Sequence, residues 1–127
     1  MSNASHILLV DDDRQVVQYL KTALEEGGYT VEATTSGTQA LVSMQASAPD
    51  LLILDLNMPA PDGFDLLKTL RKQYPYLRVM VISGYLKGAL LEAASHLGAI
   101  ATLQKPVNAE TLLAKVGEVI GGHRKVV

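Results

Sequence analysis

The chain has 127 residues, 48% hydrophobic and 19% charged, which suits one folded domain with a substantial core rather than a disordered segment. Its formal net charge of −2, without a run of lysine or arginine, argues against a nucleic-acid-binding surface. The absence of cysteine excludes disulfides and thiolate metal sites and fits the cytoplasm, and apolar runs of at most four residues are too short to span a membrane.

The N-terminal part of the chain is predicted to contain one strand and one helix. Residues 1–5 are small and polar, are expected to be flexible, and could include a vector-derived remnant. Residues 7–10 are all apolar, which is typical of a short strand covered on both faces. Asp13 is expected to cap the helix that follows, and Gly27 with Gly28 is expected to end it.

The middle of the chain repeats this order twice. Residues 30–34 alternate between polar and apolar side chains, as an edge strand does. Ser36 and Gln39 form a capping-box pattern at the start of a second helix. Residues 51–54 are a second fully apolar strand, and the third helix is expected to stop before Pro75.

The C-terminal part of the chain supplies two more units. Residues 79–82 form a third apolar strand, and the helix after it is expected to close at Gly98. Residues 101–104 are short and half polar, which suits the other edge of a sheet. Asn108 is expected to cap the last helix, and residues 121–127 read as a polar tail or the start of a linker.

Five alternating strand–helix units predict a parallel sheet with helices on both faces. At this length the flavodoxin-like strand order 2-1-3-4-5 is expected, and five units are too few for an eight-fold barrel. The predicted fold class is therefore α/β, a doubly wound (βα)5 domain that covers residues 6–120.

Polar side chains follow four of the predicted strands. They are Asp11 and Asp12 after the first strand, Asp55 after the third, Ser83 after the fourth and Lys105 after the fifth. Each has an ordinary explanation by itself, as a helix cap, a turn or a surface charge. In a sheet of this order, however, ligands bind beyond the carboxyl ends of the strands, where the first and third strands are neighbours. We therefore expect these side chains to meet at one edge.

The residue types at this edge predict a chemistry. Neighbouring carboxylates about 4 Å apart repel each other by roughly 1–4 kcal/mol per pair, so a cation is expected between them. Oxygen ligands without histidine or cysteine indicate Mg²⁺. Lys105 would add a positive charge and Ser83 a hydrogen-bond donor beside Asp55. Together they would stabilise a phosphoryl group in transfer, with Asp55 as the nucleophile.

Four motifs in order resemble the receiver domains of two-component response regulators, over nearly the whole chain. The motifs are ILLVDD at residues 7–12, LDLNMP at 54–59 followed by Asp62 and Gly63, ISG at 82–84 and KP at 105–106. The resemblance implies that Asp55 is the phospho-acceptor and that Ser83 and Lys105 contact the phosphoryl group. It also implies that Mg²⁺ is held directly by Asp12 and Asp55, through the Asn57 backbone carbonyl, and by Asp11 largely through water.

The same resemblance implies a signalling phospho-acceptor rather than an enzyme. Its phosphoryl group would come from a sensor histidine kinase or a phosphotransfer domain. The face made by the fourth helix, fifth strand and fifth helix would contact an output domain, a protein partner or a second copy of the chain. The resemblance further implies a cis peptide bond between Lys105 and Pro106, and a loop shaped by Pro59 and Gly63 before the third helix.

One position departs from the family pattern. Receivers commonly carry tyrosine or phenylalanine three residues before the lysine, and this chain has Thr102 there. The coupling between Ser83 and the output face is therefore expected to use another side chain or to be weaker. Tyr85, two residues after Ser83, is hypothesised to shield the phospho-aspartate from water.

Three other functions fit parts of the pattern. A phosphatase of the haloacid dehalogenase type also forms an aspartyl phosphate, but it needs a second acid two residues after the nucleophile, where this chain has Asn57. An FMN carrier of flavodoxin type is disfavoured, because the acidic residues 11–13 would repel the flavin phosphate. The remaining alternative is an interaction module on the same fold that is never phosphorylated. The presence of the acceptor, the acidic pair, the hydroxyl and the lysine argues against it.

Overall fold

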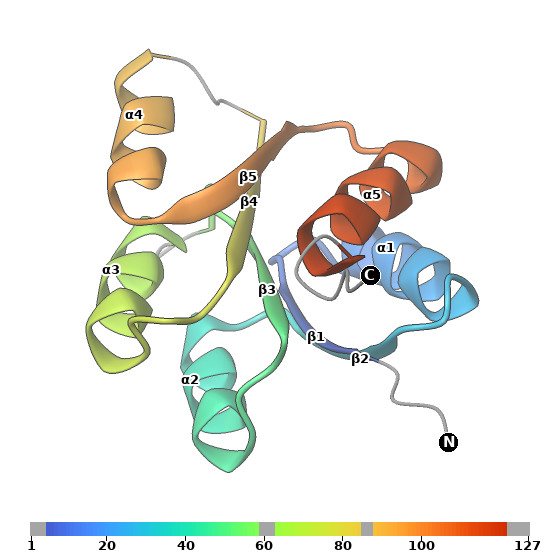
Figure 1. Ribbon diagram of the computed structural model, residues 1–127, viewed down its shortest axis with the longest axis horizontal. Helices are drawn as coiled ribbons and strands as arrows, with labels where there is room; N and C mark the ends of the chain where they lie inside the picture. Colours follow the sequence, from blue (N-terminus) through green and yellow to red (C-terminus); the bar gives the residue numbers. More distant parts are fainter. Residues whose placement is uncertain (1–4, 59–62, 85–87, 122–127) are drawn as a thin grey trace.

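The computed structural model describes residues 5–58, 63–84 and 88–121, along which strands and helices alternate (Figure 1). The strands are β1 (His6–Val10), β2 (Thr30–Thr34), β3 (Leu51–Asp55), β4 (Val79–Ser83) and β5 (Ala99–Gln104). The helices are α1 (Arg14–Glu26), α2 (Gly37–Ala46), α3 (Gly63–Gln73), α4 (Gly88–His96) and α5 (Ala109–Val116), and a π-helical turn (Gly117–Gly121) follows α5. The predicted element order is confirmed, although β5 begins earlier than predicted.

The strands form one parallel five-stranded sheet in the order β2-β1-β3-β4-β5. Helices α1 and α5 cover one face of this sheet, and α2, α3 and α4 cover the other (Figure 1). The flavodoxin-like doubly wound fold predicted from the order of elements is therefore confirmed. Within the described ranges, no helix is long and apolar enough to cross a membrane.

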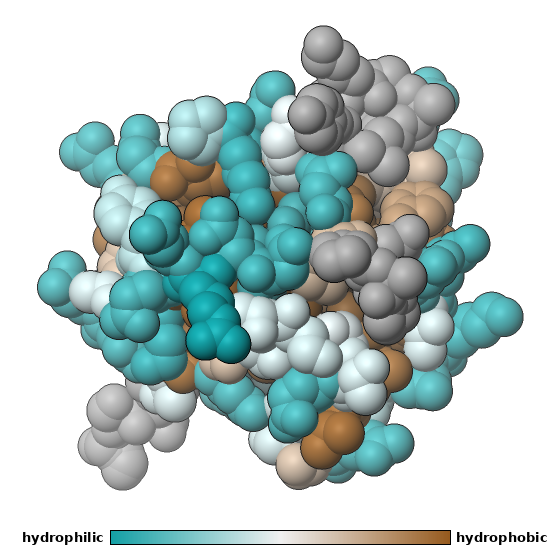
Figure 2. Space-filling model, turned by 180° about the vertical axis from the view of Figure 1, so that it is seen from behind, coloured by the Kyte–Doolittle hydropathy of each residue, from teal (hydrophilic) through white to brown (hydrophobic). Residues whose placement is uncertain are grey.

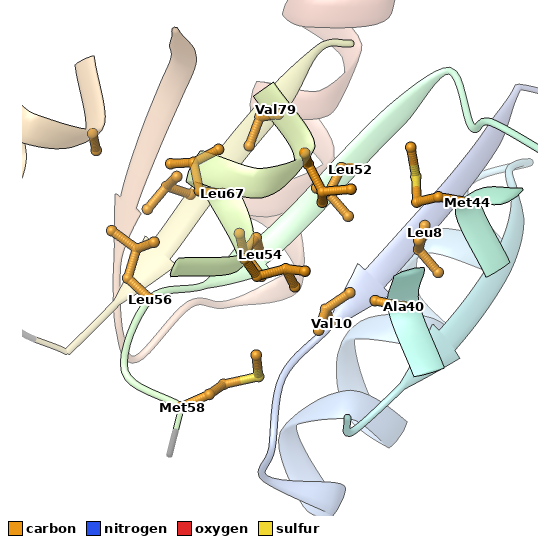
Figure 3. Packing of buried hydrophobic residues seen from close by; sticks show 14 residues of the cluster. Leu8, Val10, Ala40, Met44, Leu52, Leu54, Leu56, Met58, Leu67 and Val79 are labelled. Atoms are coloured by element: carbon orange, nitrogen blue, oxygen red, sulfur yellow. The ribbon is translucent and has the colours of Figure 1, made fainter. Parts of the chain in front are cut away.

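The alternation of side chains along each strand divides the core into two layers. In β1, Ile7 and Leu9 pack in the layer under α1 and α5, whereas Leu8 and Val10 pack in the layer under α2, α3 and α4. Figure 3 shows the second layer, where Leu8 and Val10 lie near Ala40 of α2. Because both faces of the central strands are covered, these strands carry continuous apolar runs.

Local hydrogen bonds explain where α1 begins and ends. Asp13 Oδ1 accepts the N–H of Gln15 at 3.0 Å, which confirms Asp13 as the N-cap. At the other end, Gly28 has a φ of +100°, and the N–H of Tyr29 donates to the Leu24 carbonyl at 3.1 Å. This pattern is a Schellman motif, which requires the left-handed backbone that glycine adopts most easily.

The caps of α2 and α5 agree with the sequence in part. Ser36 Oγ accepts the N–H of Gln39 at 3.2 Å, but the N–H of Ser36 donates to Thr34 Oγ1 and not to the side chain expected in a reciprocal capping box. Asn108 Oδ1 accepts the N–H of Thr111 at 2.7 Å. The predicted N-cap of α5 is therefore confirmed.

Among the side chains that the structure describes, the exposed large apolar ones come from separate segments. They are Tyr19, Val42, Tyr76 and Ile100. On the face shown in Figure 2, apolar residues are likewise interspersed among hydrophilic ones. Single exposed apolar side chains are ordinary on protein surfaces, so the polar edge of the sheet is the feature that calls for a functional explanation.

Candidate functional site

The register of the sheet brings the predicted polar residues to one edge. The register pairs nearest this edge are Val10 with Leu54, Asp55 with Ile82, and Ser83 with Gln104. Asp11 is therefore level with Asp55 on the neighbouring strand, and Lys105 follows the strand next to Ser83. The polar strand ends expected from the sequence do lie together.

The carboxylates of Asp11, Asp12 and Asp55 form one cluster. One oxygen from each lies within 4.8 Å of the others. Asp11 and Asp55 are 0% and 1% exposed, whereas Asp12 is exposed. Mg²⁺–oxygen bonds are roughly 2.1 Å long, so two ligand oxygens on opposite sides of the ion lie about 4.2 Å apart. This separation is close to that of the carboxylate oxygens, and small side-chain rotations would bring them to one ion.

Lys105 pairs with both buried carboxylates. Its Nζ lies 3.0 Å from Asp11 Oδ2 and 3.2 Å from Asp55 Oδ2. The contact with Asp55 is a hydrogen bond, and the buried Asp11 Oδ2 has the Lys105 ammonium as its ion-pair partner. The expected cis peptide bond between Lys105 and Pro106 is confirmed.

Burial and neighbouring charges shift the pKa values of this pair. Burial raises the pKa of Asp11, and the charge of Asp55 raises it further, although the N–H of Asp13 and the Lys105 ammonium oppose this rise. Burial by itself would lower the pKa of Lys105, but Asp11 and Asp55 outweigh it, so this pKa is raised. The cluster therefore favours additional positive charge.

The donor set fits a hard divalent cation. All candidate ligands are oxygens, and Asp11 Oδ2 is a buried acceptor with capacity for another partner. Mg²⁺ takes oxygen ligands and commonly keeps several waters, so it suits one exposed and two buried carboxylates. Asp11, Asp12 and Asp55, with the Asn57 carbonyl as a predicted fourth contributor, are the residues that could hold it.

Asn57 makes contacts that the sequence did not indicate. Its N–H donates to Asp55 Oδ1 at 2.9 Å. Its side-chain Oδ1 accepts the N–H of Gly84 at 3.0 Å and also the hydroxyl proton of Ser83. The resemblance to receiver domains implied a role only for the backbone carbonyl of Asn57. Asparagine often bonds to nearby backbone groups, which was the available signal, but the partner on β4 depends on the fold.

Gly63 lies against the strand that carries Asp55. A Cβ atom at Gly63 would stand 2.0 Å from the Asp55 carbonyl oxygen and 2.7 Å from Leu56 Cα, so only glycine lets α3 start this close to β3. Thr102, the departure from the family pattern, is partly exposed and pairs with Val81.

Three other residues singled out in the sequence, Pro59, Asp62 and Tyr85, lie outside the described residues. The shielding role hypothesised for Tyr85 therefore stays a prediction.

Comparison with known proteins agrees with the observed fold. The model of the response regulator receiver domain family matches residues 7–117. The response regulator MprA of Mycobacterium ulcerans is 37% identical over 110 residues, which cover 87% of this chain and 47% of that protein. A CheY-like receiver domain structure from Methanospirillum hungatei has a TM-score of 0.90 at 29% identity, covering 96% of this chain and 98% of its own. The chemotaxis protein CheY4 of Vibrio cholerae has a TM-score of 0.87 at 31% identity, covering 92% and 99%.

Proposed function

This chain belongs to the response regulator receiver domain family of two-component signalling, and from that membership we propose that it accepts a phosphoryl group on Asp55. The observation that carries the proposal is the surroundings of the Asp55 carboxylate. It is 1% exposed, lies 3.2 Å from the Lys105 ammonium, and shares a cluster with two further carboxylates. A nucleophile, a positive charge and an oxygen-ligand set in one place suit phosphoryl transfer.

The proposed cofactor is Mg²⁺, held by the carboxylates of Asp12 and Asp55 and the backbone carbonyl of Asn57, with Asp11 acting largely through water. When bound, it would neutralise negative charge that develops on the phosphoryl oxygens. The capacity of the buried Asp11 Oδ2 for a further partner and the convergence of the three carboxylates support this assignment.

In the proposed reaction, an Asp55 carboxylate oxygen attacks the phosphorus of a phosphohistidine. The new O–P bond forms as the P–N bond breaks, and the donor histidine keeps the electron pair and takes up a proton from solvent. The Lys105 ammonium, 3.2 Å from Asp55, would pair with a phosphoryl oxygen. The Ser83 hydroxyl would turn to donate a hydrogen bond to another.

The proposed donor is a sensor histidine kinase or a phosphotransfer domain. Beside Lys105 there is a cleft of about 720 Å³ between α1 and the β5–α5 loop. The residues that line it include Val16, Tyr19 and Val107 as well as Asp13. An apolar cleft next to the acceptor would let a partner dock while its histidine reaches Asp55. The encounter would take place in the cytoplasm.

The proposed output follows from a shift between two states of the domain. A phosphoryl group adds roughly −1.5 to −2 of charge, around which Ser83 and Lys105 would rearrange. Moving the equilibrium from 1:99 to 99:1 requires about 5.5 kcal/mol of differential stabilisation. The proposed output face consists of α4, β5 and α5, and Ile100 on β5 is 50% exposed there. It would contact an output domain, a protein partner or a second copy.

Incubation with Mg²⁺ and acetyl phosphate tests the proposal. Intact-protein mass spectrometry should show one added phosphoryl group, and Asp55→Asn should add none because it removes the nucleophile. Asp50→Asn is a matched control, since Asp50 is an exposed carboxylate just before β3. Its Oδ2 accepts the backbone N–H of His6, and an asparagine oxygen can do the same. Equal labelling of the wild type and Asp55→Asn would contradict the proposal, and labelling should vanish when EDTA removes Mg²⁺.

Hydrolysis of a phosphate ester distinguishes the proposed phospho-acceptor from the alternative, a phosphatase of the haloacid dehalogenase type. Asn57 lacks the proton that a second acid would donate, so we expect no sustained hydrolysis of p-nitrophenyl phosphate. Sustained Mg²⁺-dependent turnover would favour the phosphatase. An interaction module that is never phosphorylated would show neither turnover nor labelling.

A further inference from the structure

Two hydrogen-bond donors at the end of β4 converge on one side-chain oxygen. The N–H of Gly84 donates to Asn57 Oδ1 at 3.0 Å, and the Ser83 hydroxyl donates to the same oxygen. The N–H of Asn57 in turn donates to Asp55 Oδ1 at 2.9 Å. Asn57 therefore connects the proposed acceptor carboxylate with the residue proposed to respond to phosphorylation.

These contacts create a competition once a phosphoryl group is present. The Ser83 hydroxyl carries one proton, so while it donates to Asn57 Oδ1 it cannot donate to a phosphoryl oxygen on Asp55. The Gly84 N–H is engaged by the same Asn57 oxygen. An amide oxygen and a phosphoryl oxygen are both acceptors, and a charged acceptor forms the stronger hydrogen bonds.

The burial of Ser83 and the exposure of Asn57 indicate that the Asn57 side chain, and not Ser83, leaves the site. Ser83 is 0% exposed, so its hydroxyl needs a hydrogen-bond partner inside the protein in either state. Asn57 is exposed, so water can solvate its amide when the side chain turns outward. The exchange of one acceptor for the other leaves no buried donor unpaired.

We propose that the Asn57 side chain holds Ser83 and Gly84 in the unphosphorylated protein and that a phosphoryl oxygen on Asp55 displaces it. Asn57 is then a positioning residue that acts through Ser83 and sets how readily the site takes a phosphoryl group. The inference rests on the proposed function for the identity of the competitor. The contact itself is a property of the unligated protein and can be measured without a phosphodonor.

The first measurement uses beryllofluoride with Mg²⁺, a phosphoryl analogue that binds a carboxylate. Asn57→Ala removes the competing oxygen and leaves the backbone N–H and carbonyl in place. One neutral hydrogen bond corresponds to a roughly two- to tenfold change in an equilibrium constant, so we expect beryllofluoride to bind tighter by that factor. In a Ser83→Ala background the gain should be smaller, because one of the two donors is gone. Asn57→Asp, which keeps an acceptor oxygen, should not bind tighter.

The second measurement is a double-mutant cycle of urea unfolding without Mg²⁺, using Asn57→Ala, Ser83→Ala and the double variant. The two changes should be coupled by roughly two- to tenfold in the unfolding equilibrium constant, and Asn57→Asp should retain the coupling to Ser83. Should Ser83→Ala fail to fold, amide exchange of Gly84 in Asn57→Ala replaces the cycle, and it should be faster than in the wild type.

The possible results test three statements separately: the contact between Asn57 and Ser83, the competition between Asn57 and a phosphoryl oxygen, and the proposed function of the site. An additive cycle, or unchanged Gly84 exchange, would overturn the inference. If Asn57→Ala and Ser83→Ala are coupled in unfolding but Asn57→Ala does not bind beryllofluoride more tightly, the proposed competition between Asn57 and a phosphoryl oxygen is wrong. If the wild type binds no beryllofluoride, the proposed function fails and the competition with it, while the unfolding cycle still reports the contact. Coupling together with tighter binding that depends on Ser83 supports the inference.

Discussion

Asp11 is a buried carboxylate whose charged form is less favourable in the folded protein than in water, so its pKa is raised. Burial raises its pKa, and the nearby Lys105 compensates only in part. We therefore expect Asp11→Asn to increase the free energy of unfolding without Mg²⁺, by about 1.4 kcal/mol for each pKa unit of the rise. Urea unfolding in EDTA measures this effect. A decrease would mean that the ion pair with Lys105 outweighs the burial of the charge.

The raised pKa of Asp11 also makes the free energy of unfolding depend on pH. Because the pKa of Asp11 in the folded protein lies above its ordinary value of 3.8, the unfolded chain loses its proton first as the pH rises. The wild type should therefore lose stability relative to Asp11→Asn between pH 3.8 and the raised pKa. Below this window the two proteins should differ least, and above it the difference should be constant. A difference that shrinks with rising pH would reverse the sign assigned to the shift.

At the scale of elements, the start of α3 depends on the missing side chain of Gly63. Gly63→Ala would place a Cβ 2.0 Å from the Asp55 carbonyl oxygen, so α3 or β3 must move. Crowding of this kind typically costs about 1–3 kcal/mol, and it should also weaken acceptance of a phosphoryl group because Asp55 lies on the displaced strand. Thermal unfolding and labelling by acetyl phosphate measure the two effects.

Gly117 provides the control for that substitution. It begins the π-helical turn after α5 with a φ of −61°, and a Cβ there would meet no atom of the described residues within 4 Å. Gly117→Ala should therefore leave both stability and labelling close to the wild type. If the two variants behaved alike, the close approach of α3 to β3 would not be what requires Gly63.

At the scale of the whole molecule, the acidic cluster should link metal binding to folding. An ion that binds only the folded protein stabilises it by about 1.4 kcal/mol when its concentration is ten times its Kd. We expect Mg²⁺ to raise the free energy of unfolding in this way, and calorimetry over a Mg²⁺ series measures it. Asp12→Asn should abolish most of the gain. Without Mg²⁺ it should raise the free energy of unfolding only modestly, because water screens the repulsion between the exposed Asp12 and the two buried carboxylates. An equal gain in Asp12→Asn would exclude Asp12 as a ligand.

The sequence alone was enough to predict the order of the elements, the strand order and the edge at which the polar residues meet. These properties depend on local signals, because apolar runs, helical periodicity and caps such as Asp13 act over a few residues. Strand order and the position of the site then follow from general rules of parallel sheets. The sequence therefore placed four side chains at this edge before any distance was known, those of Asp11, Asp55, Ser83 and Lys105.

Tertiary structure alone decided which atoms touch and how their charges balance. The side chain of Asn57 meets Ser83 across 26 residues of sequence, and the Arg71 guanidinium donates to the carbonyls of Leu97 and Gly98 as well as to those of its own segment. The raised pKa of Asp11 likewise depends on burial by several elements. Such contacts need segments remote in the chain to arrive at hydrogen-bonding distance and angle, and local sequence patterns do not encode that geometry.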